Sequence, residues 1–213
     1  MKTILRVMIL LLLGGVCTMP LAGQEGAMSA KPKASKPADK PKEQAAMPMP
    51  KPAPEMTKMI KMMAGTWTVV ETHDPNPMMP KGGTSKGTAV LTPGPGGLSL
   101  VEKYHSTGAM GNFNGLGTFW WDPKAQVYPG VWCDNMSPTG CNNGGSTKWD
   151  GNKLVGTMDG EMNGQKIVTR FTYSDFKPNS FVMTMEMGPD ASKMQKAMTV
   201  TYTKAGGMAE KKM

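Results

Sequence analysis

Two cysteines, Cys133 and Cys141, stand in the short stretch VWCDNMSPTGC, with seven residues between them. Such a pair could ligate a metal ion, cycle as a redox couple or form a structural disulfide. A zinc site needs four ligands, and no Cys or His cluster supplies the other two. A redox pair more typically has Cys-x-x-Cys spacing. If the hairpin turn is centred on Ser137, the two Cα atoms lie about 4.5–5.5 Å apart on antiparallel neighbours, so we predict a cross-strand disulfide.

The two histidines, His73 and His105, each stand at the end of a predicted strand. Neither lies in a Gly-x-Ser-x-Gly elbow or a His-Glu-x-x-His helix, so the sequence assigns no catalytic residue and predicts no cofactor. We expect both to be exposed strand-end residues. The alternative is a metal site formed by His73, His105 and Asp74, or a haem bound through one histidine, if the two strand ends are neighbours.

Methionine is unusually frequent, with 23 residues, and its thioether is a soft ligand suited to Cu(I). The run MTMEM places Met183, Met185 and Met187 on one strand face. Their Cα atoms are about 6.6 Å apart along the strand, whereas two sulfurs on one ion must approach within about 4.6 Å. Methionine also replaces leucine in cores and occurs throughout this chain, so core filling is the favoured interpretation.

The net charge of +8 is a poor guide to a partner, because much of the excess lies in one segment, 23–54. That segment repeats Lys, Pro and Ala, with six lysines against three acidic residues. It cannot bury enough apolar surface to fold, which predicts a disordered tether. Weak association with an anionic envelope or membrane surface is its candidate partner role. The chain lacks the basic-plus-aromatic pattern of nucleic-acid binders, so no nucleic-acid partner is predicted.

The first 22 residues have the pattern of a secretory signal. Lys2 and Arg6 precede a short apolar run, 7–16, and a plausible cleavage site follows Ala22. A retained anchor or a lipidated Cys17 is the alternative, although the valine before that cysteine is not small. We therefore expect a secreted or periplasmic protein, where disulfides persist.

Residues 55–204 have the size of one domain, and 205–213 read as a flexible tail. The domain opens with Met56, Met59, Ile60 and Met63, whose spacing predicts a short amphipathic helix. After the helix the pattern changes to period two, with frequent turn signals. The candidate strands are 66–72, 84–91, 98–106, 112–121, 127–135, 141–149, 153–162, 165–174, 180–187 and 197–204. This predicts an all-β fold, a closed antiparallel up-and-down barrel of about ten strands with a short N-terminal helix.

One carboxyl breaks the apolar pattern of the predicted interior. Glu102 shares a strand face with Leu100 and Tyr104. If that face is inward, Glu102 needs a partner or a raised pKa, and Arg170 is a candidate partner by type. The alternative is a rim carboxylate in solvent.

The block LSLVEKYHSTGAMGNFNGLGTFWWDPKAQVYPGVWCDNMSPTG resembles the bacterial family known as domain of unknown function 1579. The matching motifs include LVEKY at 100–104, FNGLG at 113–117 and the Trp132-Cys133-Asp134 stretch leading to Thr139-Gly140. The resemblance covers 55–204 and implies a calycin-like barrel related to lipocalins. It also implies that Lys204 packs over Trp67 at the closed end of the barrel. The family has no established activity, so it supplies no catalytic residue.

The sequence therefore favours a barrel that binds a small, mostly apolar ligand in its lumen. Its candidate lining residues are Trp67, Leu100, Glu102, Tyr104, Trp121, Arg170, Phe171, Tyr173, Met183, Met185 and Tyr202. The first alternative is an envelope-associated structural or interaction protein with a filled barrel, and the second is a metal- or haem-binding protein using His73 or His105. A lumen below roughly 300 Å³ would argue against a ligand site.

Overall fold

The computed structural model describes residues 48–76, 79–162 and 164–206. The predicted signal segment, most of the predicted tether and residues 207–213 of the predicted tail lie outside this part of the chain. The described part contains one α-helix, one short 3₁₀ turn and ten strands. They are α1 (Pro54–Met63), β1 (Gly65–His73), β2 (Gly83–Pro93), η1 (Pro95–Gly97), β3 (Ser99–Gly108), β4 (Gly111–Trp120), β5 (Tyr128–Asp134), β6 (Cys141–Asp150), β7 (Lys153–Met162), β8 (Gln165–Lys177), β9 (Ser180–Gly188) and β10 (Gln195–Lys204).

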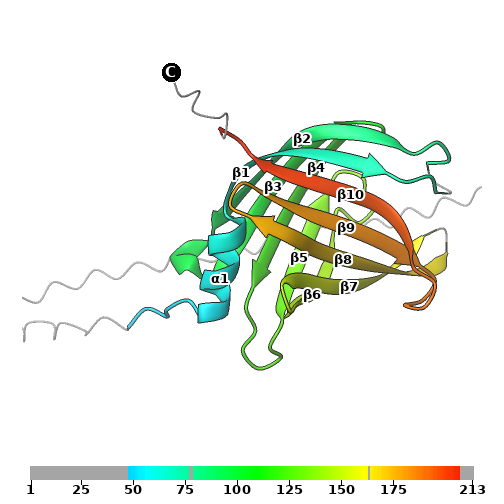
Figure 1. Cartoon of the computed structure of the whole chain (residues 1–213). Helices are drawn as coiled ribbons and strands as arrows, with labels where there is room; N and C mark the ends of the chain where they lie inside the picture. Colours follow the sequence, from blue (N-terminus) through cyan, green and yellow to red (C-terminus); the bar gives the residue numbers. More distant parts are fainter. Residues whose placement is uncertain (1–47, 77–78, 163, 207–213) are drawn as a thin grey trace, which may run out of the picture. The chain divides into compact units, whose positions relative to one another are not determined.

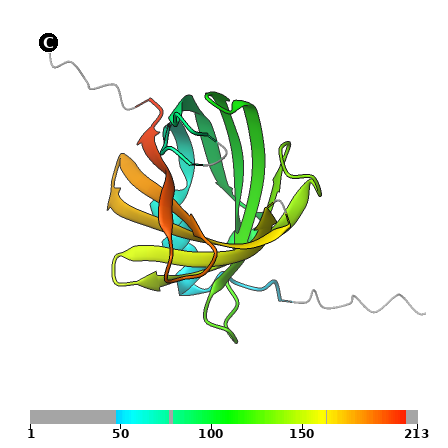
Figure 2. The ribbon, with the colours of Figure 1, turned by 90° about the vertical axis from the view of Figure 1, so that its right-hand side faces the viewer.

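The ten strands form one closed antiparallel barrel, which confirms the predicted fold class (Figures 1 and 2). Each strand pairs with its neighbours in sequence, and β1 pairs with β10 from Trp67↔Lys204 to His73↔Met198. Closure pairs both edges of every described strand, and period-two alternation then sends every second side chain into the interior. No helix in the described residues is long and apolar enough to cross a membrane.

Helix α1 lies across one end of the barrel (Figure 1). Its apolar face buries Met56, Met59 and Met63, which confirms the predicted amphipathic helix. Two barrel side chains hold its backbone. The Tyr128 hydroxyl donates to the Glu55 carbonyl at 2.9 Å. At the other end of the helix, the Trp67 Nε1–H donates to the Met63 carbonyl at 2.9 Å. The helix therefore closes this end of the barrel.

Aromatic packing fills the interior beside the helix. The Phe181 ring meets Trp67 edge-on at 4.8 Å and stacks on Tyr202 at 4.2 Å between centroids. Lys204 places its Nζ 5.6 Å from the centre of the Trp67 ring, as the family resemblance implied. Lys58 of α1 makes a closer contact of the same kind, 3.9 Å from the Trp149 ring.

The predicted disulfide is present at the opposite end of the barrel. Cys133 and Cys141 are register partners on β5 and β6, with their Cα atoms 3.9 Å apart. Asp134 holds the intervening turn, because its Oδ1 accepts the backbone N–H groups of Met136 and Ser137. The chain reverses near Ser137, as predicted, and Gly140 takes the left-handed conformation at φ 74°. The disulfide therefore fixes the register of one hairpin.

Candidate functional site

The barrel interior changes character from the helix end to the opposite end, which we call the mouth. Strand β9 shows the change, because its inward side chains become more accessible along the strand. Phe181 is 1 % exposed and Met183 is 8 % exposed, whereas Met185 and Met187 are half-buried. On β10, Met198 is likewise half-buried near the mouth. Along β9 and β10 the inward side chains therefore become more accessible toward the mouth, whereas His73, Ser85 and Ser106 on β1, β2 and β3 stay buried there.

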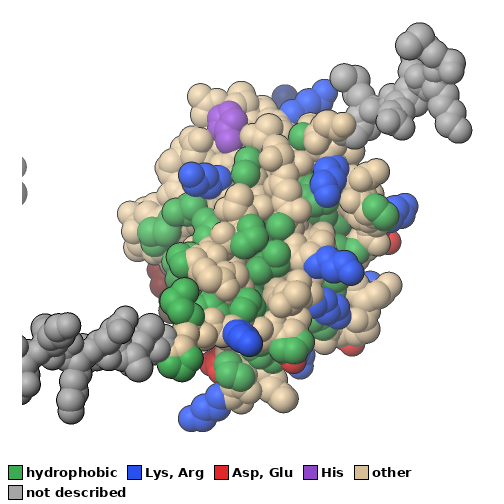
Figure 3. Space-filling model, turned by 90° about the vertical axis from the view of Figure 1, so that its left-hand side faces the viewer, with side chains coloured by type: hydrophobic (Ala, Val, Ile, Leu, Met, Phe, Trp, Pro, Cys, Tyr) green, Lys and Arg blue, Asp and Glu red, His purple; other side chains and the backbone are tan. Residues whose placement is uncertain are grey.

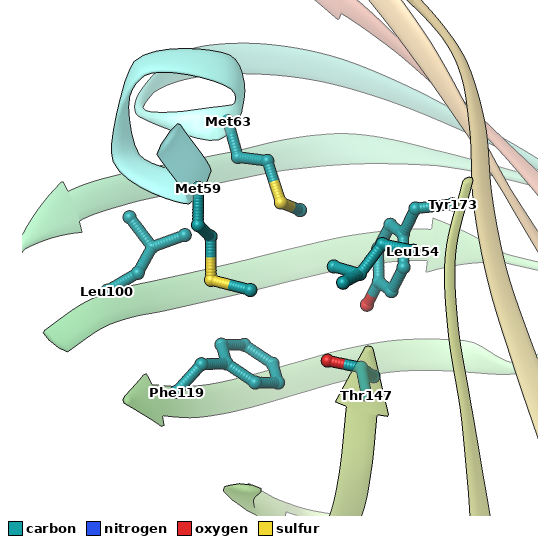
Figure 4. A pocket seen from close by; sticks show the side chains of 7 residues that line it. All are labelled: Met59, Met63, Leu100, Phe119, Thr147, Leu154 and Tyr173. Carbon is teal, nitrogen blue, oxygen red and sulfur yellow. The ribbon is translucent and has the colours of Figure 1, made fainter. Parts of the chain in front are cut away.

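The helix half of the interior is filled by side chains. Its cavity has a volume of about 10 Å³ and lies between α1 and the barrel wall (Figure 4). The lining side chains are Met59, Met63, Leu100, Phe119, Thr147, Leu154 and Tyr173. This space is the size of one water molecule, and the buried Thr147 Oγ1 has no protein hydrogen-bond partner in the described part of the chain. A drug-sized ligand would need hundreds of Å³, so this half is core.

The mouth half is lined by aromatic and thioether groups. The half-buried inward side chains on this level are Phe113, Trp132, Phe171, Met185 and Met198. Glycines on β4 make room for the Trp132 indole, because a Cβ at Gly115 would lie 2.3 Å from that ring. The Phe113 ring stacks on Trp132 with a centroid distance of 6.4 Å and an interplanar angle of 15°. The accessible lining is therefore predominantly apolar and flat.

The inward faces of β1, β2 and β3 carry a buried, hydrogen-bonded polar network beside this lining. The Glu71 Oε1 accepts the Tyr104 hydroxyl at 2.6 Å, and its Oε2 lies 2.9 Å from the His73 Nε2. The same imidazole nitrogen lies 3.3 Å from the Ser85 Oγ. All four side chains are buried, and because a carboxylate can only accept hydrogen bonds, we assign Nε2 as the nitrogen that donates to Glu71. Burial, followed by the bond to Glu71, raises the pKa of Tyr104 above its ordinary value.

A second buried carboxyl lies near the middle of the barrel. Glu102 is 3 % exposed, and its Oε1 accepts the Tyr202 hydroxyl at 3.3 Å. Burial raises the pKa of Glu102 from 4.5 to about 7, and the bond to Tyr202 only partly opposes that effect. Burial also raises the pKa of Tyr173 and of Tyr202, with a further contribution from the charge of Glu102. The rim alternative for Glu102 is therefore wrong, and its inward placement is confirmed.

Arg170 is not the partner of Glu102. Residues Thr169 and Phe171 on either side of it face inward, so Arg170 points to the outer surface. There its Nη1 pairs with the Glu186 Oε2 at 3.4 Å, and its Nη2 donates to the Ala191 carbonyl at 3.3 Å. Including Arg170 among the lumen candidates was wrong, because it was chosen by type as a partner for Glu102 and lies on the opposite face of β8 from Phe171.

The expectation of two exposed histidines is half wrong. His105 is exposed on the outer face and bonds to Asn114, whereas His73 is buried inside the barrel. The two side chains point to opposite sides of the sheet, and Asp74 pairs with Lys196 at 3.4 Å. They cannot form the proposed shared site, and the described part of the chain holds no cluster of three His, Cys, Asp or Glu residues.

The other lumen candidates divide between the two halves. The core beside the helix contains Trp67, Leu100, Met183 and Tyr202, together with Trp121, whose ring packs on Tyr128 at 4.9 Å. Nearer the mouth lie Phe171 and Met185, Glu102 and Tyr104 occupy the middle, and Tyr173 lines the small cavity beside the helix. The sequence reasoning missed Glu71, Ser85, Phe113, Trp132 and Met198. Alternation alone could have placed Glu71 and His73 inside, because they follow Trp67 and Val69 at every second position.

A second hollow of about 590 Å³ lies on the outer side of the barrel wall. It is lined by side chains such as Trp120, Val131 and Asn143, near the bulge where the β5–β6 register shifts. The hollow is broad and open to solvent, and no buried carboxylate of the described residues lines it. The interior therefore remains the stronger candidate.

A family model described as "Protein of unknown function (DUF1579)" matches residues 52–204, which is the whole barrel with its helix. The chain belongs to the DUF1579 family. The family match confirms the resemblance recognised in the sequence motifs. A search of curated proteins found no match to the chain. The DUF1579 description names no activity, so the chemistry of the interior follows only from its residues.

Several solved β-barrels are similar to this DUF1579 chain. Rv2717c from M. tuberculosis is 11 % identical with a TM-score of 0.49, and the match covers 72 % of this chain and 98 % of that one. The redesigned barrel mFAP1, bound to DFHBI, is 16 % identical with a TM-score of 0.37, covering 67 % of this chain and 95 % of that one. A fluorescence-activating β-barrel designed de novo is 10 % identical with a TM-score of 0.37, covering 67 % of this chain and 94 % of that one. At these scores the likenesses carry no statement about a ligand.

Proposed function

We propose that this DUF1579 protein binds a small, mostly apolar ligand in the mouth half of its barrel. The observation that carries the proposal is the gradient of accessibility along β9 and β10, from 1 % at Phe181 to half-buried at Met185 and Met198. A barrel whose interior served only stability would be packed throughout, as its helix half is. Barrel mouths are a usual place for small-molecule sites.

The lining suits a flat apolar molecule. Phe113 and Trp132 offer stacked aromatic surface on one side, and Met185 and Met198 offer adaptable thioether chains on the other. The Tyr104 ring lies 6.4 Å from Trp132 and is held from behind by Glu71. The polar network therefore orients part of the wall, while the ligand contacts mainly apolar groups.

The helix half supports the rival interpretation, in which side chains fill the barrel. The 10 Å³ cavity there is far below the size of a ligand site. That half contains the aromatic anchors of α1, which explains its packing as a structural plug. Near the mouth the rival accounts for His73, Ser85 and Ser106, which are buried, but it does not account for the inward methionines Met185 and Met198, which are half-buried.

Binding of the neutral dye N-phenyl-1-naphthylamine tests the proposal. Saturable binding to one site is expected, with at least a tenfold loss in Met185→Trp, because an inward indole would occupy the mouth half. Thr184→Trp is the matched control, because it adds the same indole at the neighbouring outward position of β9. Equal binding by both variants and the unchanged protein would show that the dye is not in the lumen.

The location we propose is extracellular or periplasmic. The disulfide between Cys133 and Cys141 is compatible with an oxidising compartment, and the signal-like pattern of 1–22 supports export. We also propose weak association with an anionic envelope surface through the lysine-rich segment 23–54. The helix-end face of the barrel supports this, because lysine and arginine side chains are frequent on it and acidic ones are few (Figure 3).

A further inference from the structure

Three inward side chains with soft or borderline donor atoms lie side by side at the mouth. His73 on β1 is the register partner of Met198 on β10, and Met198 is the register partner of Met185 on β9. A bulge between Lys196 and Met198 sets this alignment. The two methionines point inward, pack against the core and are half-buried, so part of each side chain stays accessible.

The cross-strand spacing removes the main geometric objection to a thioether metal site. Along one strand, same-face Cα atoms are about 6.6 Å apart, which is wide for two sulfurs on one ion. Across an antiparallel pair, the Cα atoms are only about 4.5–5.5 Å apart. Two flexible thioethers at that spacing can bring their sulfurs within the roughly 4.6 Å that bonds of about 2.3 Å allow. Met185 and Met198 have this relation, and the sequence alone did not pair them.

The imidazole of His73 is oriented so that it can serve as a third metal ligand. In the neutral tautomer assigned from the contact with Glu71, Nε2 carries the hydrogen and Nδ1 carries the lone pair. Nδ1 makes no hydrogen bond to another residue in the described part of the chain. A carboxylate that receives the far N–H of an imidazole is the usual support of a metal-binding histidine. The inward positions of the described strands in this half carry no lysine or arginine, so the surroundings favour a cation.

We propose that the mouth half holds one soft monovalent ion, Cu(I), between the thioethers of Met185 and Met198 and the Nδ1 of His73. Thioether and imidazole ligands suit this ion, and Glu71 orients the imidazole. The site goes beyond the binding of an apolar ligand and does not depend on it.

Competition against the Cu(I) chelator bicinchoninate tests the site, with the full chain and its Cys133–Cys141 disulfide intact. The unchanged protein is expected to withdraw one Cu(I) per chain, and Met185→Leu and Met198→Leu are each expected to weaken retention at least tenfold. Leucine keeps the volume of methionine and offers no donor. Met183→Leu is the matched control and should leave retention unchanged. It lies on the same face of β9 one step deeper, where its register partners Val200 and Tyr173 bring no soft donor.

A second variant separates ligation from folding. His73→Gln keeps an N–H donor for Glu71 but removes the basic ring nitrogen, so it should lose at least tenfold in Cu(I) retention. Native near-UV circular dichroism and unchanged dye binding would show that the variant is folded. Retention equal to that of the unchanged protein in both leucine variants would overturn the site, as would failure of the unchanged protein to withdraw one ion. Full retention in folded His73→Gln would overturn the role of Nδ1.

Discussion

The substitution Glu102→Gln should make the protein more stable at pH 8 and leave it nearly unchanged at pH 4. Glu102 is buried in the barrel and accepts one hydrogen bond from Tyr202. The glutamine carbonyl can accept the same bond and does not ionise. The only large difference between the two side chains is therefore the cost of a buried charge, which depends on pH.

The magnitude follows from the raised pKa. Folding shifts the pKa of Glu102 from 4.5 to about 7, so the folded state holds the proton more tightly than the unfolded chain. The contribution of Glu102 to the free energy of unfolding is fully present below pH 4.5. It falls as the pH rises from 4.5 to about 7 and stays constant above that range. The full loss is about 3 kcal/mol, which Glu102→Gln should recover at pH 8. At pH 4 the two proteins should agree within about 1 kcal/mol.

Urea unfolding at pH 4 and pH 8, followed by tryptophan fluorescence, measures this difference. At pH 8 the midpoint of the variant should rise by about 1–2 M urea. Glu186→Gln is the control, because that carboxylate lies on the outer surface beside Arg170, where a pair contributes less than about 1 kcal/mol. A stability difference for Glu102→Gln that is the same at both pH values would refute the reasoning, since it would mean that Glu102 does not titrate across this range.

Three further predictions concern the groups that hold the barrel and its network. Tyr104→Phe should lower the free energy of unfolding at pH 7 by about 2–3 kcal/mol, because the buried Glu71 carboxylate loses a hydroxyl donor. Urea unfolding measures this loss, and a loss below about 0.5 kcal/mol would contradict the network. Replacing both Cys133 and Cys141 with serine should cost about 2–3 kcal/mol, because the loop closed by the disulfide is short. Thiol labelling of the non-reduced, folded protein should modify neither cysteine, and labelling of both would disprove the disulfide. Trp67→Phe should lower the midpoint of thermal unfolding by several degrees, because it leaves the Met63 carbonyl without its donor and removes buried ring area. An unchanged midpoint would mean that this hydrogen bond does not anchor α1.

The fold could be predicted from the sequence because the patterns that mark its elements are local. Period-two alternation and turn residues mark each strand, and the methionine spacing at 56, 59 and 63 marks the helix. Antiparallel hairpins in unbroken succession leave closure as the way to remove both edges. The disulfide was also local, since Cys133 and Cys141 face each other across one turn.

Less of the candidate site could be predicted from the sequence, because its contacts join strands that are far apart in the chain. Glu71 meets Tyr104 across 33 positions, and Tyr202 meets Glu102 across 100. No local pattern encodes such pairs, and they appear only once the register of the closed barrel is known. Arg170 shows the complementary error, because residue type suggested a partner for Glu102 while the alternation of β8 sends Arg170 to the outer surface.

Native mass spectrometry of the full chain, purified from its own host without reduction, tests the central claim most directly. If the mouth half of the barrel is a ligand site, the spectrum should show the chain with one small molecule bound. That adduct should be absent from Met185→Trp and retained by Thr184→Trp. A bare chain mass for the unchanged protein, together with no saturable dye binding, would contradict the account and leave the barrel as a structural domain.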